Sequence, residues 1–327
     1  MKGYVVEQWL KGPDDLKLSE TDVPVPKEGQ LLIDVKAVGL NFFDILMIQG
    51  RYQIKPPFPF IPGGEFAGVV LKSTVAQYKP GDRVFGSGNG FAEQVVVEAD
   101  KCIRIPSKLS FEEAAGLYIT YPTSYAALVL RAKLQPGEIC LVHAAAGGVG
   151  IAAVQIAKAL GATVIATAGS AEKLEVAKKY GADFCINYRD KDWTNQVKKV
   201  TKGHGADVIY DPVGMIDESM KCTAWNGRIL IVGFAKGSFE KIAVNRVLLK
   251  NISLVGVHWG AYFNFEKESV PEVWKALLDM LETGKLKSAI YDKVYTLQTI
   301  PEALNAIANR ETYAKVVARI GGHDSKI

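Results

Sequence analysis

The sequence predicts an α/β protein in which a doubly wound parallel sheet is joined to a second, β-rich domain. Its 327 residues exceed the length of a typical single domain and suit two. Strand and helix patterns alternate through the middle of the chain, and short β-rich runs separated by glycine and proline turns precede them. The hydrophobic share of 48% and the charged share of 23% are ordinary for a globular protein, which argues against a disordered or fibrous chain.

The β-rich segment extends from residue 2 to about residue 105. Each of its runs LLIDVKAVG, RVFG and FAEQVVVEA follows a turn signal, namely Gly29-Gln30, Pro80-Gly81-Asp82 and Gly90. Because regular short strands with such turns are typical of barrels and sandwiches, we expect a barrel-like domain here.

Alternation begins near residue 123 with EICLVHA, GVGIAAVQIAKAL, ATVIAT, AEKLEVAKKY and DFCIN, and predicts parallel strands joined by crossover helices. Buried-strand candidates follow at ADVIYD, RILIVGF and ISLVGV. Two helix patterns, PEVWKALLDMLETG and IPEALNAIANR, and a last strand, KVVARI, do not extend the repeat. We expect them to return to the first domain, which gives one domain over 1–122 and 267–327 and another over 123–266.

The charge balance gives no sign of a nucleic-acid or membrane partner. The net charge of +4 comes from 39 basic and 35 acidic side chains spread along the chain. No apolar stretch reaches membrane-spanning length, and Met1-Lys2-Gly3 leads directly into the alternation Tyr4-Val5-Val6 without a secretory pattern. We therefore expect a cytoplasmic protein.

The most specific motif is HAAAGGVGIAAVQIA, in which a strand runs into a glycine turn and the turn into an amphipathic helix. On the dinucleotide-binding fingerprint of Rossmann domains, Ala145, Gly147 and Gly150 take the three glycine positions. Gly147 lets the backbone approach a pyrophosphate, and Gly150 lets the helix pack closely on the strand. The helix start offers free N–H groups and a positive dipole end to the phosphates.

The next strand, ATVIAT, favours NADPH over NADH. In NAD-preferring folds this strand ends in an acid that binds the ribose 2′-hydroxyl, but here the position is Ala168. Gly169-Ser170 and Lys173 follow and offer a hydroxyl and a positive charge to a 2′-phosphate. Tyr188, after the following strand, adds a donor. Taken alone, Lys173 would be interpreted as an ordinary surface lysine. Together with the missing acid, this group of residues favours NADPH.

With these motifs the chain resembles the zinc-less quinone oxidoreductases, which include the zeta-crystallins, within the medium-chain dehydrogenase/reductase superfamily. The resemblance covers almost the whole chain. Its motifs are GLNFFD, IPGGEFAGVV, KPGDRVFG, AAAGGVG, GSAEK, INYRD, ADVIYDPVG, GRILIVGF and ANRETYAKVV. It implies that the β-rich part is a GroES-like barrel domain and that the protein is a homodimer or homotetramer in which ISLVGV lies at a subunit edge.

The resemblance also implies positions for the cofactor. Asn41 and Thr123 would lie beside the nicotinamide, where an amide and a hydroxyl can orient the ring, and Arg310 would join the groups around the 2′-phosphate. The other implied contacts are Ala146, Gly147, Gly148, Val149 and Gly150 at the pyrophosphate, Gly169, Ser170, Lys173 and Tyr188 at the 2′-phosphate, and Gly233, Phe234, Val257, His258 and Trp259 at the nicotinamide.

Two departures from the family pattern affect the site. Ala314 stands where glycine usually precedes the lysine, which puts the local backbone in question. Leu46 stands where some relatives have a tyrosine, which leaves Tyr52 as the candidate aromatic hydroxyl near the substrate. Packing in a loop beside Pro56 and Pro57 is an equally good account of Tyr52.

The zinc ligands of related alcohol dehydrogenases are missing. Those enzymes carry a cysteine where this chain has Asn41 and a histidine where it has Gly64, and Glu65 alone cannot hold zinc, which needs at least three protein ligands. The four cysteines lie far apart without a CxxC pair and are expected to be reduced, mostly buried thiols, and the four histidines are scattered.

A site without zinc suits conjugated electron acceptors. Hydride addition to an isolated carbonyl concentrates charge on one oxygen, whereas a quinone or enone spreads it through the conjugated system. We expect an NADPH-dependent quinone reductase, with Asn41 positioning the reactants and Tyr52 contacting the substrate. The alternatives are reduction of α,β-unsaturated carbonyls or enoyl thioesters by the same cofactor, and a low-turnover NADPH-binding protein of the crystallin or RNA-binding kind.

Overall fold

The computed structural model describes residues 1–237 and 239–321, and the chain divides into two compact units. Unit 1 contains Met1–Ile119 and the segment from Ser288 onward, and unit 2 is Thr120–Lys287. The second boundary differs from the expected one at residue 267. The helix α10 (Ser269–Glu282) stays in unit 2 because it packs on α3 (Thr120–Tyr125) there.

Unit 2 contains the expected alternation of strands and helices. After α3 and a π-helical segment, Ala126–Arg131, its further elements are β8 (Ile139–Val142), α4 (Gly148–Ala159), β9 (Thr163–Ala168), α5 (Ala171–Lys179), β10 (Phe184–Asn187), α6 (Trp193–Val200), β11 (Ala206–Asp211), α7 (Ile216–Ser219), β12 (Thr223–Ile231), α8 (Val244–Lys250), β13 (Ser253–Gly256), α9 (Trp259–Phe265) and α10.

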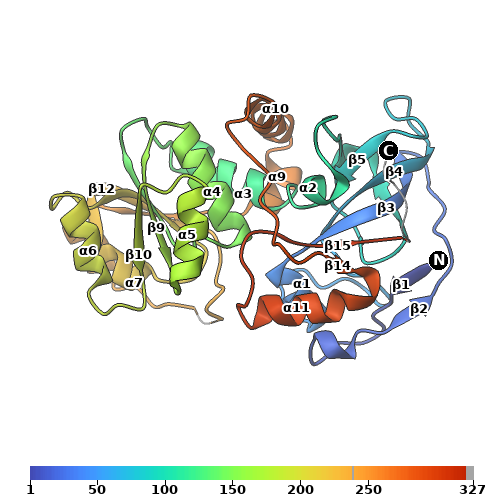
Figure 1. Cartoon of the computed structure of the whole chain (residues 1–327), viewed down its shortest axis with the longest axis horizontal. Coiled ribbons are helices and arrows are strands. Elements are labelled where there is room, and N and C mark those ends of the chain that lie inside the picture. Colours follow the sequence, from blue (N-terminus) through green and yellow to red (C-terminus); the bar gives the residue numbers. More distant parts are fainter. Residues whose placement is uncertain (238, 322–327) are drawn as a thin grey trace. The chain divides into compact units, whose positions relative to one another are not determined.

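The doubly wound parallel sheet is confirmed. Over the described residues its order is β10-β9-β8-β11-β12-β13, and neighbouring strands run parallel. Figure 1 shows α4 and α5 as neighbouring green helices along this sheet, where they pack on β8, β9 and β10. The carboxyl ends of all these strands therefore meet at one edge of the sheet, which we call the carboxyl edge.

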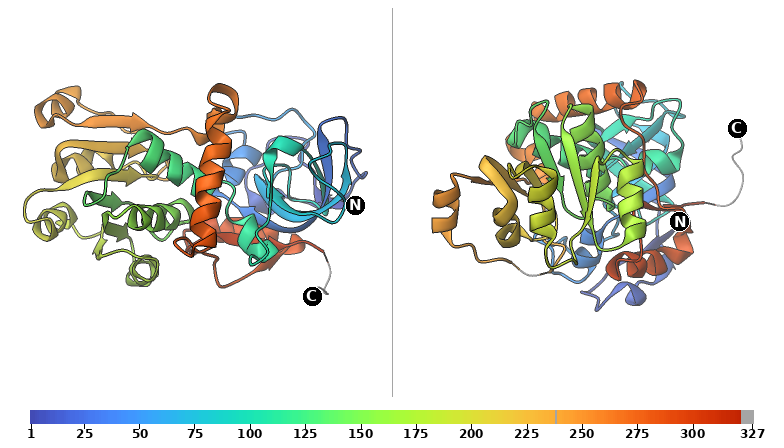
Figure 2. Two further views of the ribbon diagram at one scale, coloured as in Figure 1. Left: turned by 90° about the horizontal axis from the view of Figure 1, so that it is seen from above. Right: turned by 60° about the vertical axis from the view of Figure 1, so that its left-hand side comes forward.

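The strand β13 forms an outer margin of this sheet, and α8 precedes it. Figure 2 shows both in orange at one side of unit 2. None of the residues of α8 is buried, and Val244, Leu248 and Leu249 are 79%, 77% and 72% exposed. The helix at this margin of the sheet thus exposes large apolar side chains.

Unit 1 is built mainly of β-strands. Its elements are β1 (Lys2–Tyr4), β2 (Leu18–Glu20), β3 (Gln30–Leu40), α1 (Phe42–Ile48), β4 (Glu65–Ser73), β5 (Arg83–Gly86), β6 (Gln94–Glu98), β7 (Cys102–Arg104), α2 (Phe111–Ala115), β14 (Tyr295–Thr296), α11 (Ile300–Ala308) and β15 (Val316–Arg319), with short 3₁₀ turns at Pro13–Asp15, Ala99–Lys101 and Leu297–Thr299.

The strand β3 is the centre of unit 1. In the described part of the chain the main sheet has the order β14-β15-β3-β4-β5-β7, and β6 also pairs with β3. The C-terminal strand β15 lies antiparallel against β3, and α11 packs beside α1, as Figure 1 shows. This arrangement brings the start of α1, the start of β4 and the residue before β15 together, although they are far apart in the sequence.

Candidate active site

The turn from β8 to α4 has the geometry that the fingerprint requires. Gly147 is the N-cap of α4 in an extended conformation, with φ −78° and ψ 170°. The N–H of Ile151 is bonded to the carbonyl of Gly147 at 2.8 Å, so the N–H groups of the preceding first turn are left for a ligand. Ala144 adopts the left-handed region with φ 46°, which marks a sharply bent turn.

The two fingerprint glycines have different surroundings. A Cβ on Gly150 would lie 2.2 Å from the carbonyl oxygen of Ala144 and 2.8 Å from Cα of Ala145, so this position has no room for a side chain. A Cβ on Gly147 would meet only the Ala144 oxygen, at 3.3 Å. The turn is therefore packed closely at Gly150 and open at Gly147, as helix-to-strand packing and phosphate approach would require.

A buried histidine fixes the base of this turn. His143 bonds to Thr167 through Nδ1 at 2.7 Å and to Ser219 through Nε2 at 2.8 Å. Because the Ser219 hydroxyl donates to the carbonyl of Met215, it accepts from Nε2–H, and the Thr167 hydroxyl donates to Nδ1. Burial lowers the pKa of His143, so the neutral ring ties the ends of β8 and β9 to α7.

The end of β9 lacks an acid and is surrounded by donors. Ala168 is its last residue and pairs with Asn187 of β10, so the residues that follow the two strands are neighbours. Ser170 caps α5 by accepting from the N–H of Lys173 at 3.4 Å. A Cβ on Gly169 would lie 3.0 Å from the hydroxyl of Tyr188, which places that hydroxyl against the end of the strand.

Sequence reasoning missed one residue here. The Nε of Arg189 would lie 3.1 Å from a Cβ on Gly169, and the side chain is exposed. The signal was available in the motif INYRD, because the residues after neighbouring parallel strands meet at the same edge. Arg189 is therefore a further candidate for binding a 2′-phosphate.

The remaining candidates of unit 2 also lie mostly at the carboxyl edge. Gly233 and Phe234 follow β12, and the 44% exposed ring of Phe234 contacts Phe239 at 5.0 Å between ring centroids. Val257 and His258 follow β13.

Two of these candidates differ from the rest. Trp259 begins α9 and is buried, with its ring 5.2 Å from that of Tyr262. Thr123 is half-buried in α3 instead of following a strand.

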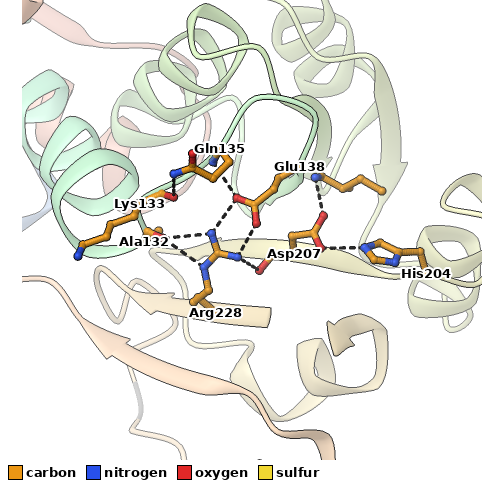
Figure 3. A network of polar contacts seen from close by, with 8 residues as sticks. Ala132, Lys133, Gln135, Glu138, His204, Asp207 and Arg228 are labelled. Atoms are coloured by element: carbon orange, nitrogen blue, oxygen red, sulfur yellow. Dashed lines mark hydrogen bonds and ion pairs between the residues drawn. The ribbon is translucent and has the colours of Figure 1, made fainter. Parts of the chain in front are cut away.

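The opposite, amino edge of the same sheet carries a structural ion pair (Figure 3). Arg228 donates to both carboxylate oxygens of Glu138, at 2.7 and 2.8 Å, and to the carbonyl of Ala132. The carboxylate of Asp207 accepts from the N–H of Ile139 at 2.8 Å. The pairing with Arg228 lowers the pKa of Glu138, so this network stabilises the sheet at the edge opposite the residues that follow β9 and β10.

In unit 1, Asn41 belongs to a buried polar network. Its Nδ2 donates to Oε1 of Glu65 at 3.0 Å, and its Oδ1 accepts from Nζ of Lys315 at 2.5 Å. The backbone N–H groups of Asn41 and Gly64 donate to the carboxylate of Asp44, at 2.8 and 3.1 Å. Burial raises the pKa of Asp44 to about 7.

The other candidates of unit 1 are Tyr52 and Arg310. The half-buried ring of Tyr52 stacks on that of Phe43 at 5.3 Å, and burial together with the charge of Asp44 raises the pKa of its hydroxyl. Arg310 is exposed after α11 with φ 60°. Ala314 also adopts the left-handed region, with φ 53°, which explains why glycine is usual there.

The comparisons with known proteins match both units. Residues 27–107 match the alcohol dehydrogenase GroES-like domain and residues 148–283 match the zinc-binding dehydrogenase family. The chain is 41% identical to a quinone oxidoreductase-like protein 2 homolog of Nematostella vectensis over 88% of its own length and 81% of the relative's. No helix in the described ranges is long and apolar enough to cross a membrane.

Two solved structures resemble the whole chain. The Escherichia coli quinone oxidoreductase complexed with NADPH has a TM-score of 0.87 and 30% identity, covering 98% of this chain and 100% of that one. The CurK enoyl reductase has a TM-score of 0.88 and 28% identity, covering 98% and 99%. The GroES-like architecture of the β-rich unit is thereby confirmed.

The residues of this chain do not fit the zinc that the second family's description names. Asn41 and Gly64 replace the expected ligands, and the ammonium of Lys315 is bonded to Asn41 and paired with Glu65. Over residues 1–237 and 239–321, no three histidine, cysteine or acidic side chains gather as metal ligands. With both of its units matched and the zinc ligands replaced, the chain belongs to the quinone oxidoreductase branch of the medium-chain dehydrogenases/reductases.

Proposed function

We propose that this protein is an NADPH-dependent reductase of quinones. The observation that carries the proposal is the end of β9, where Ala168 replaces an acid and Ser170, Tyr188 and Arg189 lie around the following residue. Such a group of donors suits a phosphate monoester and leaves the ribose hydroxyls of NADH without their usual acceptor. The E. coli relative, complexed with NADPH, supports the same cofactor.

The residues of the chain provide binding and orientation. The nicotinamide cofactor supplies a hydride when it is bound. In the proposal, the first turn of α4 holds the pyrophosphate, Lys173 and its neighbours hold the 2′-phosphate, and Asn41 orients the nicotinamide end. Tyr52 is proposed as a substrate contact, although its stacking on Phe43 shows that it also has a packing role.

The cofactor assignment is tested by charge reversal on α5. Lys173→Glu places a negative charge beside the 2′-phosphate, and we expect the KM for NADPH to rise about 10- to 100-fold while that for NADH changes little. Lys178→Glu, in the last turn of the same helix, is the matched control with the same change in net charge. Equal effects of Lys173→Glu on the two nucleotides would contradict the assignment.

The substrate is tested with a panel of quinones and a panel of enones and enoyl thioesters, measured as NADPH oxidation. A preference for quinones is expected. The likeness to an enoyl reductase makes the second panel the best alternative, and a preference for it would replace quinone as the substrate. Tight NADPH binding without oxidation by any acceptor would favour the low-turnover binding protein.

We also propose a homodimer formed along β13. This strand is the margin of the parallel sheet and α8 beside it exposes three large apolar side chains. An open strand edge with apolar neighbours is normally covered. Sedimentation equilibrium distinguishes a dimer from a tetramer, and a monomer at micromolar concentration would refute the proposal.

A further inference from the structure

Lys315 is a buried cation whose partners come from distant segments of unit 1. The residue is 4% exposed, and its ammonium contacts Oδ1 of Asn41 and forms an ion pair with Oε1 of Glu65, which is 0% exposed. Asn41 precedes α1, Glu65 begins β4 and Lys315 immediately precedes β15. A buried charge is tolerated when it is paired and hydrogen-bonded, and this one meets both conditions.

These partners fix which end of the Asn41 amide faces which neighbour. An ammonium has three donors and no acceptor, so the atom that faces Lys315 is the amide oxygen. An ionised carboxylate only accepts, so the atom that faces Glu65 is the amide nitrogen. The two ends of an amide look alike in outline, but here the charged neighbours leave one orientation.

The carboxylate of Glu65 is itself held in place. Its Oε2 accepts from the N–H of Ile119 at 3.0 Å, which turns Oε1 toward Asn41 and Lys315. A Cβ on Gly39 would lie 2.3 Å from the carbonyl oxygen of Ala115 and 2.8 Å from Oε1 of Glu65. The backbone of β3 at Gly39 therefore lies close to the carboxylate, and a side chain at this position would displace it.

Both hydrogens of the Asn41 amide are consequently directed at acceptors inside the protein. One is donated to Glu65 at 3.0 Å, and the other points toward the carbonyl of Gly39 at the longer distance of 3.5 Å. The oxygen has two lone pairs, of which Lys315 takes one. Because both amide hydrogens have partners inside the protein and Lys315 takes one lone pair, what Asn41 can offer to a ligand is the second lone pair of this oxygen.

We propose that Asn41 acts on its ligand as a hydrogen-bond acceptor, and that Lys315 is the positioning residue that sets this polarity. The identity of the ligand rests on the proposed function: the group that binds Asn41 is a donor, such as a ribose hydroxyl or the carboxamide nitrogen of a nicotinamide nucleotide. The same polarity means that Asn41 does not donate to the oxygen of a reduced quinone or enone. Other groups therefore donate the proton to that oxygen and stabilise its charge.

Two variants test the role of Lys315. Lys315→Arg keeps a charged donor and is expected to bind NADPH within about threefold of the wild type. Lys315→Met alone leaves Glu65 as an unpaired buried charge and can prevent folding, so it is combined with Glu65→Gln. This double variant has lost both charges. The side-chain amide that it introduces beside Asn41 offers either a donor or an acceptor, so the orientation of the Asn41 amide is no longer fixed.

The double variant is expected to fold and to bind NADPH about three- to tenfold more weakly than the wild type, because it loses one hydrogen bond of fixed polarity. Nucleotide binding is measured by quenching of protein fluorescence and folding by thermal melting. Affinity that is kept in Lys315→Arg but reduced in the double variant supports a positioning role. A folded double variant with wild-type affinity for NADPH and a wild-type KM and kcat would overturn it.

A second measurement reads the amide directly. In the wild type the side-chain NH₂ of Asn41, observed by ¹⁵N NMR, is expected to exchange with solvent more slowly than in the double variant, and to shift little when NADPH binds. Rapid exchange in the wild type, or a large NH₂ shift on binding, would overturn the acceptor assignment. If the wild type binds neither nicotinamide nucleotide, the proposed function fails, while the exchange rates still decide the polarity set by Lys315.

Discussion

Substituting the two glycines of the β8–α4 turn one at a time separates folding from cofactor binding. Gly150→Ala places a Cβ 2.2 Å from the backbone oxygen of Ala144, a contact that no side-chain rotation can relieve. The first turn of α4 must then move away from β8. Overpacking of this kind costs about 1–3 kcal/mol, and each kcal/mol lowers the melting temperature of a domain of this size by roughly 2–4 °C.

Gly147→Ala perturbs the turn in a different way. The backbone at this position is extended and accepts any residue, and the nearest atom to the new Cβ is 3.3 Å away. Loss of stability is limited to the weaker capping by alanine, up to about 1 kcal/mol. The methyl group instead occupies the approach to the first-turn N–H groups, and losing one charge-assisted hydrogen bond to a phosphate corresponds to an affinity about 10- to 100-fold lower.

Thermal melting and NADPH titration of the two purified variants form the assay. We expect the larger drop in melting temperature for Gly150→Ala and, among variants that remain folded, the larger drop in affinity for Gly147→Ala. NADPH affinity equal to the wild type in Gly147→Ala would refute the idea that the pyrophosphate lies on this turn. Unchanged stability in Gly150→Ala would refute the close packing.

Two further predictions concern stability. Arg228→Met removes the partner of Glu138 at the amino edge, and because both side chains are partly exposed we expect a loss of about 1–3 kcal/mol at pH 7. Pairing lowers the pKa of Glu138, so the stability that the ion pair contributes is present above the unfolded-state pKa and is lost as pH falls through the folded-state pKa. If urea unfolding shows the same difference in stability between wild type and variant at pH 7 and at low pH, this account is wrong. Ala314→Gly removes the strain of an alanine in the left-handed region and is expected to stabilise the protein by about 0.5–1 kcal/mol. The control Ala318→Gly, inside β15, is expected to destabilise it. A lower melting temperature in both variants would contradict the idea that Ala314 is strained.

The parallel sheet was predictable because its strands are short apolar runs and its helices have apolar faces. The turn at Gly147 was also predictable, because its signal is local: a strand, a glycine turn and a helix follow one another within a few residues. The helix α10 was placed in the wrong domain, because a helix pattern shows that a face is apolar but not which partner covers it.

The parts of the site that depend on pairing between separate segments were not predicted from the sequence. Arg189 lies against Gly169 only because β9 and β10 are adjacent in register, although the motif that contains it was noticed. The contact between Lys315 and Asn41 joins residues 274 positions apart. No local pattern marks such a lysine, except that it directly precedes the apolar strand Val316–Arg319.

The division of unit 1 into two chain segments affects the order in which the protein can fold during synthesis. Unit 2 is continuous, so all of it leaves the ribosome before the segment from Ser288 onward. Until β15 emerges, the end of β3 from Ala37 to Leu40 lacks the strand that pairs with it there, and Asn41 and Glu65 lack their cation. The nascent chain therefore carries a carboxylate without its counter-charge, and the segment from Ser288 onward completes both the sheet and the charge balance around Asn41.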